Sequence, residues 1–165
     1  MESKGKCGFV YTVETLDKDG NLLERERVLN VMPIEALNYI VSVAFKQGPQ
    51  FGQWYAGLYQ GNYTPTKQEE MATFPSMAQE FTGYEGAGRP AIVFGPVANG
   101  RVDNMASPIE LTFTQDVEVR GGFVTNSSGK GSTSGLCASV VRFSSPKRPG
   151  VGGVLRIYIA QEFYS

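Results

Sequence analysis

Hydrophobic and polar residues alternate along much of this chain, in short runs that turn residues separate. The last third holds four such apolar-rich runs: Ile109–Thr114, Val117–Thr125, Leu136–Ser144 and Val154–Phe163. Three of the four place their large apolar side chains mainly on one parity, and the breaks between them are rich in Ser, Gly and Asp. A period of two residues broken by turn residues is typical of half-buried antiparallel strands. The end of the chain is therefore predicted to be all-β.

The N-terminal part predicts a hairpin with strands over Gly8–Leu16 and Leu22–Leu29. The turn between them contains Asp19 and Gly20, a pair that readily supplies the positive φ of a tight turn. The charged run Glu24–Arg27 alternates acidic and basic residues within the second strand. This alternation is interpreted as the solvated face of an edge strand.

One amphipathic helix is predicted near residues 33–47. Pro33 suits a first helical position, and Gly48 with Pro49 supplies the stop. A single apolar stripe follows the helical period: Ile34, Leu37, Val41, Ala44 and Phe45. We expect this stripe to dock on the protein's own sheet, with docking on a partner as the alternative.

The middle of the chain is less regular. Strands are predicted over Gln53–Gln60, Ala91–Gly95 and Arg101–Ala106, and a short helical turn is predicted after Thr66, where Glu69 completes a capping-box pattern. About eight or nine strands with turns every ~8–12 residues in the second half favour a β-sandwich or barrel. We expect one domain over residues 1–165, with the hairpin and helix in 1–50 and the main sandwich in 51–165.

Composition restricts the chemistry. The 165 residues include no histidine, which removes the commonest general base and metal ligand, and the formal net charge of −1 gives no drive toward nucleic acid. Cys7 and Cys137 are too few and too far apart for a structural zinc site. Whether they form a disulfide is left open, with reduced thiols as the default because no secretory signal is visible. No apolar run approaches the ~18 residues of a membrane span.

Three constellations suggest chemistry but lack a required part. Lys130 in Gly129–Thr133 is followed by glycine, and a strand follows where a phosphate loop needs a helix, so a flexible hairpin loop is predicted. Asp17–Asn21 lacks the later ligands of a calcium loop. Glu110 and Glu118, on two strands expected to form a hairpin, share a polar face with Arg120 and are interpreted as solvated. We therefore expect no enzyme activity, cofactor, metal or small-molecule substrate.

Several different short motifs lie along the second two-thirds of the chain: Trp54–Leu58, Phe81–Tyr84, Arg89 with Pro90, Leu111–Thr114, Val119–Thr125, Lys130–Gly135, Val141–Ser144 and Val154–Ile159. Together they span residues 52–161 and resemble a family of tailed-bacteriophage virion structural proteins. The motifs hold the fold and are not catalytic. Gly152 and Gly153 depart from the family pattern, which favours Gly-Asp before the last strand.

The resemblance implies a jelly-roll-like fold and a capsid cement or decoration protein. Such a protein binds the major capsid protein on the outside of the assembled shell, self-associates as a dimer or trimer, and assembles in the bacterial cytoplasm. The alternative is a neck, tail or fibre-associated virion protein, or a glycan-binding β-sandwich. Contact elements are expected in Met1–Gly8 and Gly61–Gly88. The candidate interface residues are Phe51, Trp54, Tyr55, Tyr59, Tyr84 and Arg89.

Overall fold

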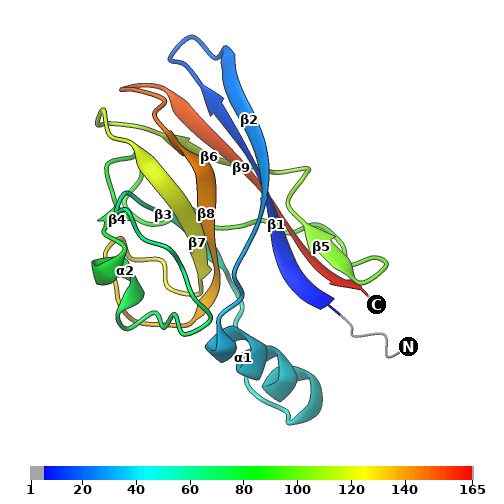
Figure 1. Ribbon diagram of the computed structural model, residues 1–165. Coiled ribbons are helices and arrows are strands. Elements are labelled where there is room, and N and C mark those ends of the chain that lie inside the picture. The colour runs from blue at the N-terminus through cyan, green and yellow to red at the C-terminus, as the bar shows by residue number, and fades with distance from the viewer. Residues whose placement is uncertain (1–5, 165) are drawn as a thin grey trace.

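Two antiparallel sheets face each other in the computed structural model, which describes residues 6–164 (Figure 1). The first sheet has the order β2 (Leu22–Leu29), β1 (Lys6–Leu16) and β9 (Val154–Tyr164), and the far side of β9 pairs with both β5 (Arg101–Asp103) and β6 (Ile109–Thr112). The second sheet has the order β4 (Glu80–Phe81), β3 (Tyr55–Tyr59), β7 (Val119–Thr125) and β8 (Cys137–Lys147). The predicted antiparallel β-sandwich is confirmed.

The main core lies between the two sheets. Strand β1 pairs with β9 along its whole length, so the N-terminal hairpin and the C-terminal strand share one sheet. As the sequence alternation predicted, one parity of β1 is buried, including Phe9, Tyr11 and Val13. The opposite sheet contributes Val141 and Phe143 to the same core. Removing these apolar side chains from water is the main force that holds the sheets together.

The second sheet is buried on its outer face as well. The segment 61–79, with the short helix α2 (Phe74–Met77), covers that face and forms a second apolar cluster: Tyr59, Met71, Phe74, Ala78, Phe123, Cys137 and Val140. Burial on both faces explains why β7 and the first half of β8, residues 137–141, are almost continuously buried instead of alternating. Buried residues such as Met71 and Phe74 thus anchor the segment Gly61–Gly88 to the core, while many of its other residues are exposed, so a contact role for this segment stays a prediction. Of the other expected contact segment, Met1–Gly8, residues 1–5 lie outside the described residues.

Two glycine–aromatic pairs allow the second cluster to pack closely on the sheet. Gly57 lies opposite Phe123, and Gly121 lies opposite Tyr59, across the β3–β7 ladder. A Cβ atom on Gly57 would sit 2.3 Å from the Phe123 ring, and one on Gly121 would sit 2.3 Å from the Tyr59 ring. Each ring therefore lies flat over a position that only glycine can occupy.

The expected hairpin between residues 109–114 and 117–125 is wrong, because β6 belongs to the first sheet and β7 to the second. The turn carries the chain from one sheet to the other. Glu110 accordingly faces Arg156 of β9, at 2.7 Å, instead of sharing a face with Glu118. The predicted strand at Ala91–Gly95 is reduced to a single bridge between Ala91 and Tyr55.

The charged strand β2 is only half solvated. Arg25 is exposed on the outer face, but Glu24 and Glu26 turn inward and bind the amine of Lys147, at 2.5 and 2.6 Å. Partial burial acts to raise the pKa of Glu26, but Lys147 and Ser144 outweigh it and hold that pKa below its ordinary value. These contacts connect β2, an edge strand of the first sheet, with β8, an edge strand of the second sheet.

Candidate functional site

Helix α1 (Ile34–Phe45) lies at one end of the molecule, beyond the ends of both sheets (Figure 1). The helix is confirmed, but the predicted orientation of its apolar stripe is wrong. Ile34, Leu37, Val41 and Phe45 are exposed, at 41%, 37%, 54% and 80% of their full surface. The helix faces the sandwich instead with a second stripe, which also follows the helical period: Ala36, Tyr39, Ile40 and Val43.

An apolar groove of about 280 Å³ runs between this second stripe and the sandwich. Its far wall comes from Phe9 of β1, Val124 of β7 and Ala138 of β8, and Phe94 and Phe163 also line it. None of its lining residues is charged, and Gln50 and Gln161 are its only amide side chains. A groove of this composition favours an apolar or aromatic group of a partner over a polar small molecule.

Three aromatic side chains give the groove a rigid wall. The rings of Tyr39 and Phe51 stack at 4.8 Å between centroids, and Trp54 meets both edge-on, at 5.7 and 5.8 Å. The backbone N–H of Phe51 donates to the Tyr39 hydroxyl at 2.9 Å. The Gln53 amide donates to the carbonyls of Trp54 and Ile92, both at 2.9 Å. The segment after α1 is thus fixed to the helix on one side and to the sheet on the other.

The structure brings two of the six candidate interface residues together in the groove, Phe51 and Trp54. Tyr55 is half-buried in the β3 ladder, next to the groove and outside its lining. Tyr59 and Tyr84 are buried, and burial raises the pKa of each phenol above its ordinary value. Their surroundings make them core residues of this chain.

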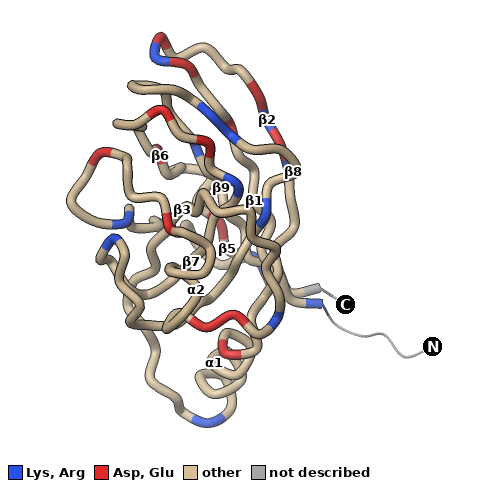
Figure 2. Tube along the Cα trace, turned by 60° about the vertical axis from the view of Figure 1, so that its left-hand side comes forward, with Lys and Arg blue, Asp and Glu red and all other residues tan. Residues whose placement is uncertain are grey.

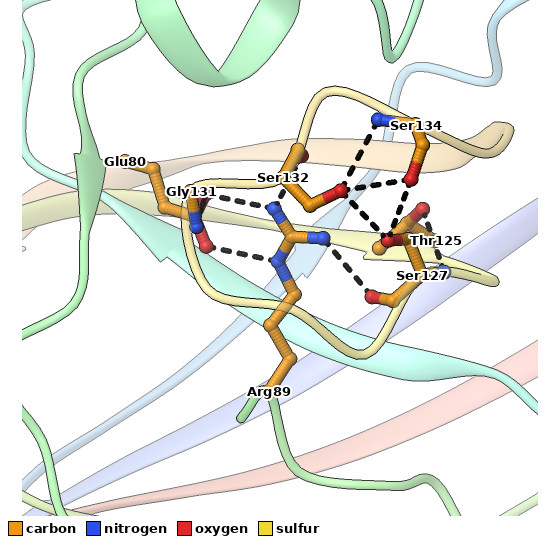
Figure 3. Close-up of polar contacts among 7 residues, drawn as sticks. All are labelled: Glu80, Arg89, Thr125, Ser127, Gly131, Ser132 and Ser134. Carbon is orange, nitrogen blue, oxygen red and sulfur yellow. Dashed lines mark hydrogen bonds and ion pairs between the residues drawn. The ribbon is translucent and has the colours of Figure 1, made fainter. Parts of the chain in front are cut away.

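Arg89, the sixth candidate, is also buried (Figure 3). Its Nε and Nη2 atoms donate to the two carboxylate oxygens of Glu80 at 2.9 and 2.8 Å. The same guanidinium donates to the carbonyls of Ser127, at 3.0 Å, and Ser132, at 2.8 Å. Glu80 in turn accepts from the backbone N–H of Gly131 at 2.9 Å. The pair thus fixes the β7–β8 loop on the sandwich.

The Ser/Gly-rich stretch does connect two antiparallel neighbours, β7 and β8, but it is anchored instead of flexible. Besides the contacts of Arg89, the Lys130 amine donates to the Tyr84 carbonyl at 2.6 Å and lies 3.9 Å from the centre of the Tyr84 ring. Desolvation lowers the pKa of Lys130. The amine of the former phosphate-loop candidate is therefore already bound to backbone carbonyls.

Within the described residues, 6–164, no group of three His, Cys, Asp or Glu side chains is placed to hold a metal ion. Both thiols are free, and burial raises the pKa of Cys7 and of Cys137. None of the described helices has the length and apolarity needed to cross a membrane. Comparison of the chain with models of known protein families and with curated proteins finds no match.

Sequence reasoning missed the groove residues Tyr39 and Phe94. A signal for Tyr39 was present, because Ala36, Ile40 and Val43 accompany it at helical spacing. This short helix has two apolar stripes, and the sequence pattern alone does not show which of them packs against the sandwich. The loop residue Phe94 has no periodic signal around it.

Proposed function

We propose that this protein is a non-enzymatic virion subunit of a tailed bacteriophage, a cement or decoration protein that binds the assembled capsid shell. The family resemblance of residues 52–161 supports this role, and the antiparallel sandwich agrees with the fold that the resemblance implies. In this proposal the groove between α1 and the sandwich receives an apolar side chain of the major capsid protein. Binding only the assembled shell stabilises that shell by mass action.

The observation that carries the proposal is the uncharged, aromatic-walled groove at the α1 end. Stacked and edge-on rings at Tyr39, Phe51 and Trp54 hold the groove open before a partner arrives. A preformed apolar recess avoids the ordering cost of closing a flexible surface around a ligand. Aromatic residues that surround a desolvated pocket are also the usual composition of binding hot spots.

A blocking substitution tests the groove. Gln50 is exposed at the groove lining, so Gln50→Trp fills the opening without removing a core side chain. Gln115→Trp, at an exposed position outside the groove lining, is the matched control. Each protein is mixed with purified particles that lack this subunit, and the bound fraction is measured after sedimentation. We expect wild type and Gln115→Trp to saturate the particles and Gln50→Trp to lose at least tenfold in affinity.

Equal binding of Gln50→Trp and wild type would reject the groove as the contact. Failure of the wild-type chain to bind particles at all would reject the capsid role. The number of copies bound at saturation tests the location, because a cement protein matches the count of shell subunits. A count limited to one vertex or to the tail would reassign the protein to the neck or tail.

A further inference from the structure

The outward stripe of α1 is exposed, and the helix cannot rotate to bury it. The Glu35 carboxylate accepts from the backbone N–H groups of Cys137, at 2.5 Å, and Met71, at 3.3 Å. The backbone N–H of Ile34 donates to the Lys67 carbonyl at 2.9 Å. Ala36, one residue further on, is buried against the sandwich. These contacts fix the rotation of the helix, so its exposed apolar face is a built feature.

The spacing of the stripe is that of a helix-pairing seam. Ile34, Leu37, Val41 and Ala44 are separated by three, four and three residues, which is the a-d-a-d pattern of two heptads. Ala44 is exposed at the edge of this stripe and also lines the groove. When such a seam pairs with an antiparallel copy of itself, each a position meets a d position. Leu37 then faces Val41 of the other copy, and Ile34 faces Ala44. The stripe is therefore complementary to itself, as an isologous two-fold contact requires.

Charge also favours a second copy as the occupant. Glu35 is the only charged residue within α1, it is held by the sandwich, and Lys46 follows the helix (Figure 2). Two copies can thus approach without burying an unpaired charge. A helix that lies on a membrane surface carries a rim of Lys and Arg, which α1 lacks. The position of α1 beyond both sheets leaves the seam open to another molecule (Figure 1).

The other route to self-association, through the free edge of β2, is disfavoured. Two copies of an edge strand related by a two-fold axis place residues of the same face opposite each other. On β2 the outer face carries Arg25 and Arg27, and the inner face carries Glu24 and Glu26. Every fully overlapping two-fold register therefore sets like charges opposite one another. Edge strands are commonly protected against pairing in this way.

We propose that the outward face of α1 is a self-association surface, on which α1 of a second copy packs antiparallel about a two-fold axis. A 12-residue helix is ~18 Å long, so the pair buries less than the ~1,600 Å² of a standard interface. The dimer is accordingly weak in solution and strengthens where copies are concentrated on a surface. The proposal does not depend on capsid binding, since it is tested on the isolated protein.

The first test is sedimentation velocity over a range of protein concentrations. We expect the wild-type mass to rise from 18.0 kDa toward twice that value as concentration increases. Val41→Glu places a charge in the seam, and we expect it to stay monomeric. Val151→Glu is the matched control, because Val151 is similarly exposed (61%) in the β8–β9 turn. Circular dichroism should show the same fold for all three proteins, since neither valine is a core residue.

The second test determines the direction of pairing. Leu37→Lys alone should also be monomeric, but a mixture of Leu37→Lys with Val41→Glu should dimerise again. In the antiparallel pair the new lysine faces the new glutamate, while the other Leu–Val contact is unchanged. A parallel pair would not bring the two charges together, so failure of the mixture to dimerise would overturn the arrangement. We expect Val151→Glu to dimerise like wild type. A wild-type chain that stays monomeric, or a Val41→Glu variant that dimerises as strongly as Val151→Glu, would overturn the proposal itself. This holds even if Val41→Glu or Leu37→Lys lost binding to particles.

Discussion

Burial separates two arginine–carboxylate pairs that have the same geometry. Arg89 and Glu80 form two charge-assisted hydrogen bonds with side chains 0% and 3% exposed. Arg148 and Asp116 form two at 2.8 Å, with side chains 55% and 52% exposed. Water already solvates the exposed pair, whereas the buried Glu80 carboxylate has, among the described residues, only the backbone N–H of Gly131 as a hydrogen-bond donor besides Arg89. The contribution to folding should therefore differ although the bonds look alike.

We predict that Arg89→Ala destabilises the protein by about 3–5 kcal/mol, because it leaves the Glu80 carboxylate buried and unpaired. Arg148→Ala, the matched control, should change the free energy of unfolding by no more than the error of the measurement. Urea denaturation of the three proteins measures both values. The double variant Arg89→Met, Glu80→Leu should recover part of the loss, since it removes both charges. Equal losses for Arg89→Ala and Arg148→Ala would contradict this account.

These two arginines also show why residue roles were hard to predict. The bidentate partner of Arg89 lies nine residues earlier, and its carbonyl partners lie in a loop that starts 37 residues later. No local pattern in the sequence marks that meeting. The sequence therefore suggests Arg89, Tyr59 and Tyr84 as interface residues, although all three are buried in the fold. Phe51 and Trp54 reached the groove because an aromatic-rich run close to a helix end was visible in the sequence.

At the scale of elements, strands with one buried face were predictable, and the predicted N-terminal hairpin of β1 and β2 is confirmed. Partners that are distant in the sequence, such as β1 and β9, were not predictable. The alternation in β1 and β9 predicted strands there, and both are present. The pattern does not record which sheet a strand joins, so β6 and β7 were wrongly placed in one hairpin. The segment 61–79 has no regular period, because it covers a sheet face with isolated side chains such as Met71 and Phe74.

The short helix α2 provides a direct test of that segment as part of the core. Phe74 is fully buried, and its ring meets those of Tyr59 and Phe123 at 5.6 and 5.3 Å. We predict that Phe74→Ala costs about 3–5 kcal/mol of stability, through lost burial and a residual cavity. Met77→Ala, in the same helix but largely exposed, should stay within roughly 0.5 kcal/mol of wild type. Urea denaturation measures the free energy of unfolding of each protein. A small loss of stability for Phe74→Ala would show that the core does not need this segment.

At the scale of the whole molecule, the outer face of the first sheet and the α1 end differ in their density of charge. The outer face of the first sheet carries a row of alternating charges over four strands: Arg25, Glu14, Arg156 and Glu110. Figure 2 shows these strands to be much richer in charge than α1. Exposed ion pairs of this kind add little stability but keep a sheet face hydrated. The opposite character of the α1 end, with its groove and outward stripe, makes that end the surface that can release free energy on association.

This difference in charge predicts which side of the molecule is covered on the particle. In hydroxyl-radical footprinting, we expect Phe51 and Trp54 in the groove to lose reactivity when the protein binds shells. Tyr158, which pairs with Thr12 on the charged outer face, should keep the reactivity it has in the free protein. Each particle sample is compared with free protein below the concentration at which it self-associates, so that dimer formation is not mistaken for shell contact. Protection of Tyr158 with unchanged groove aromatics would place the shell on the charged sheet and would reverse the assignment of the two faces.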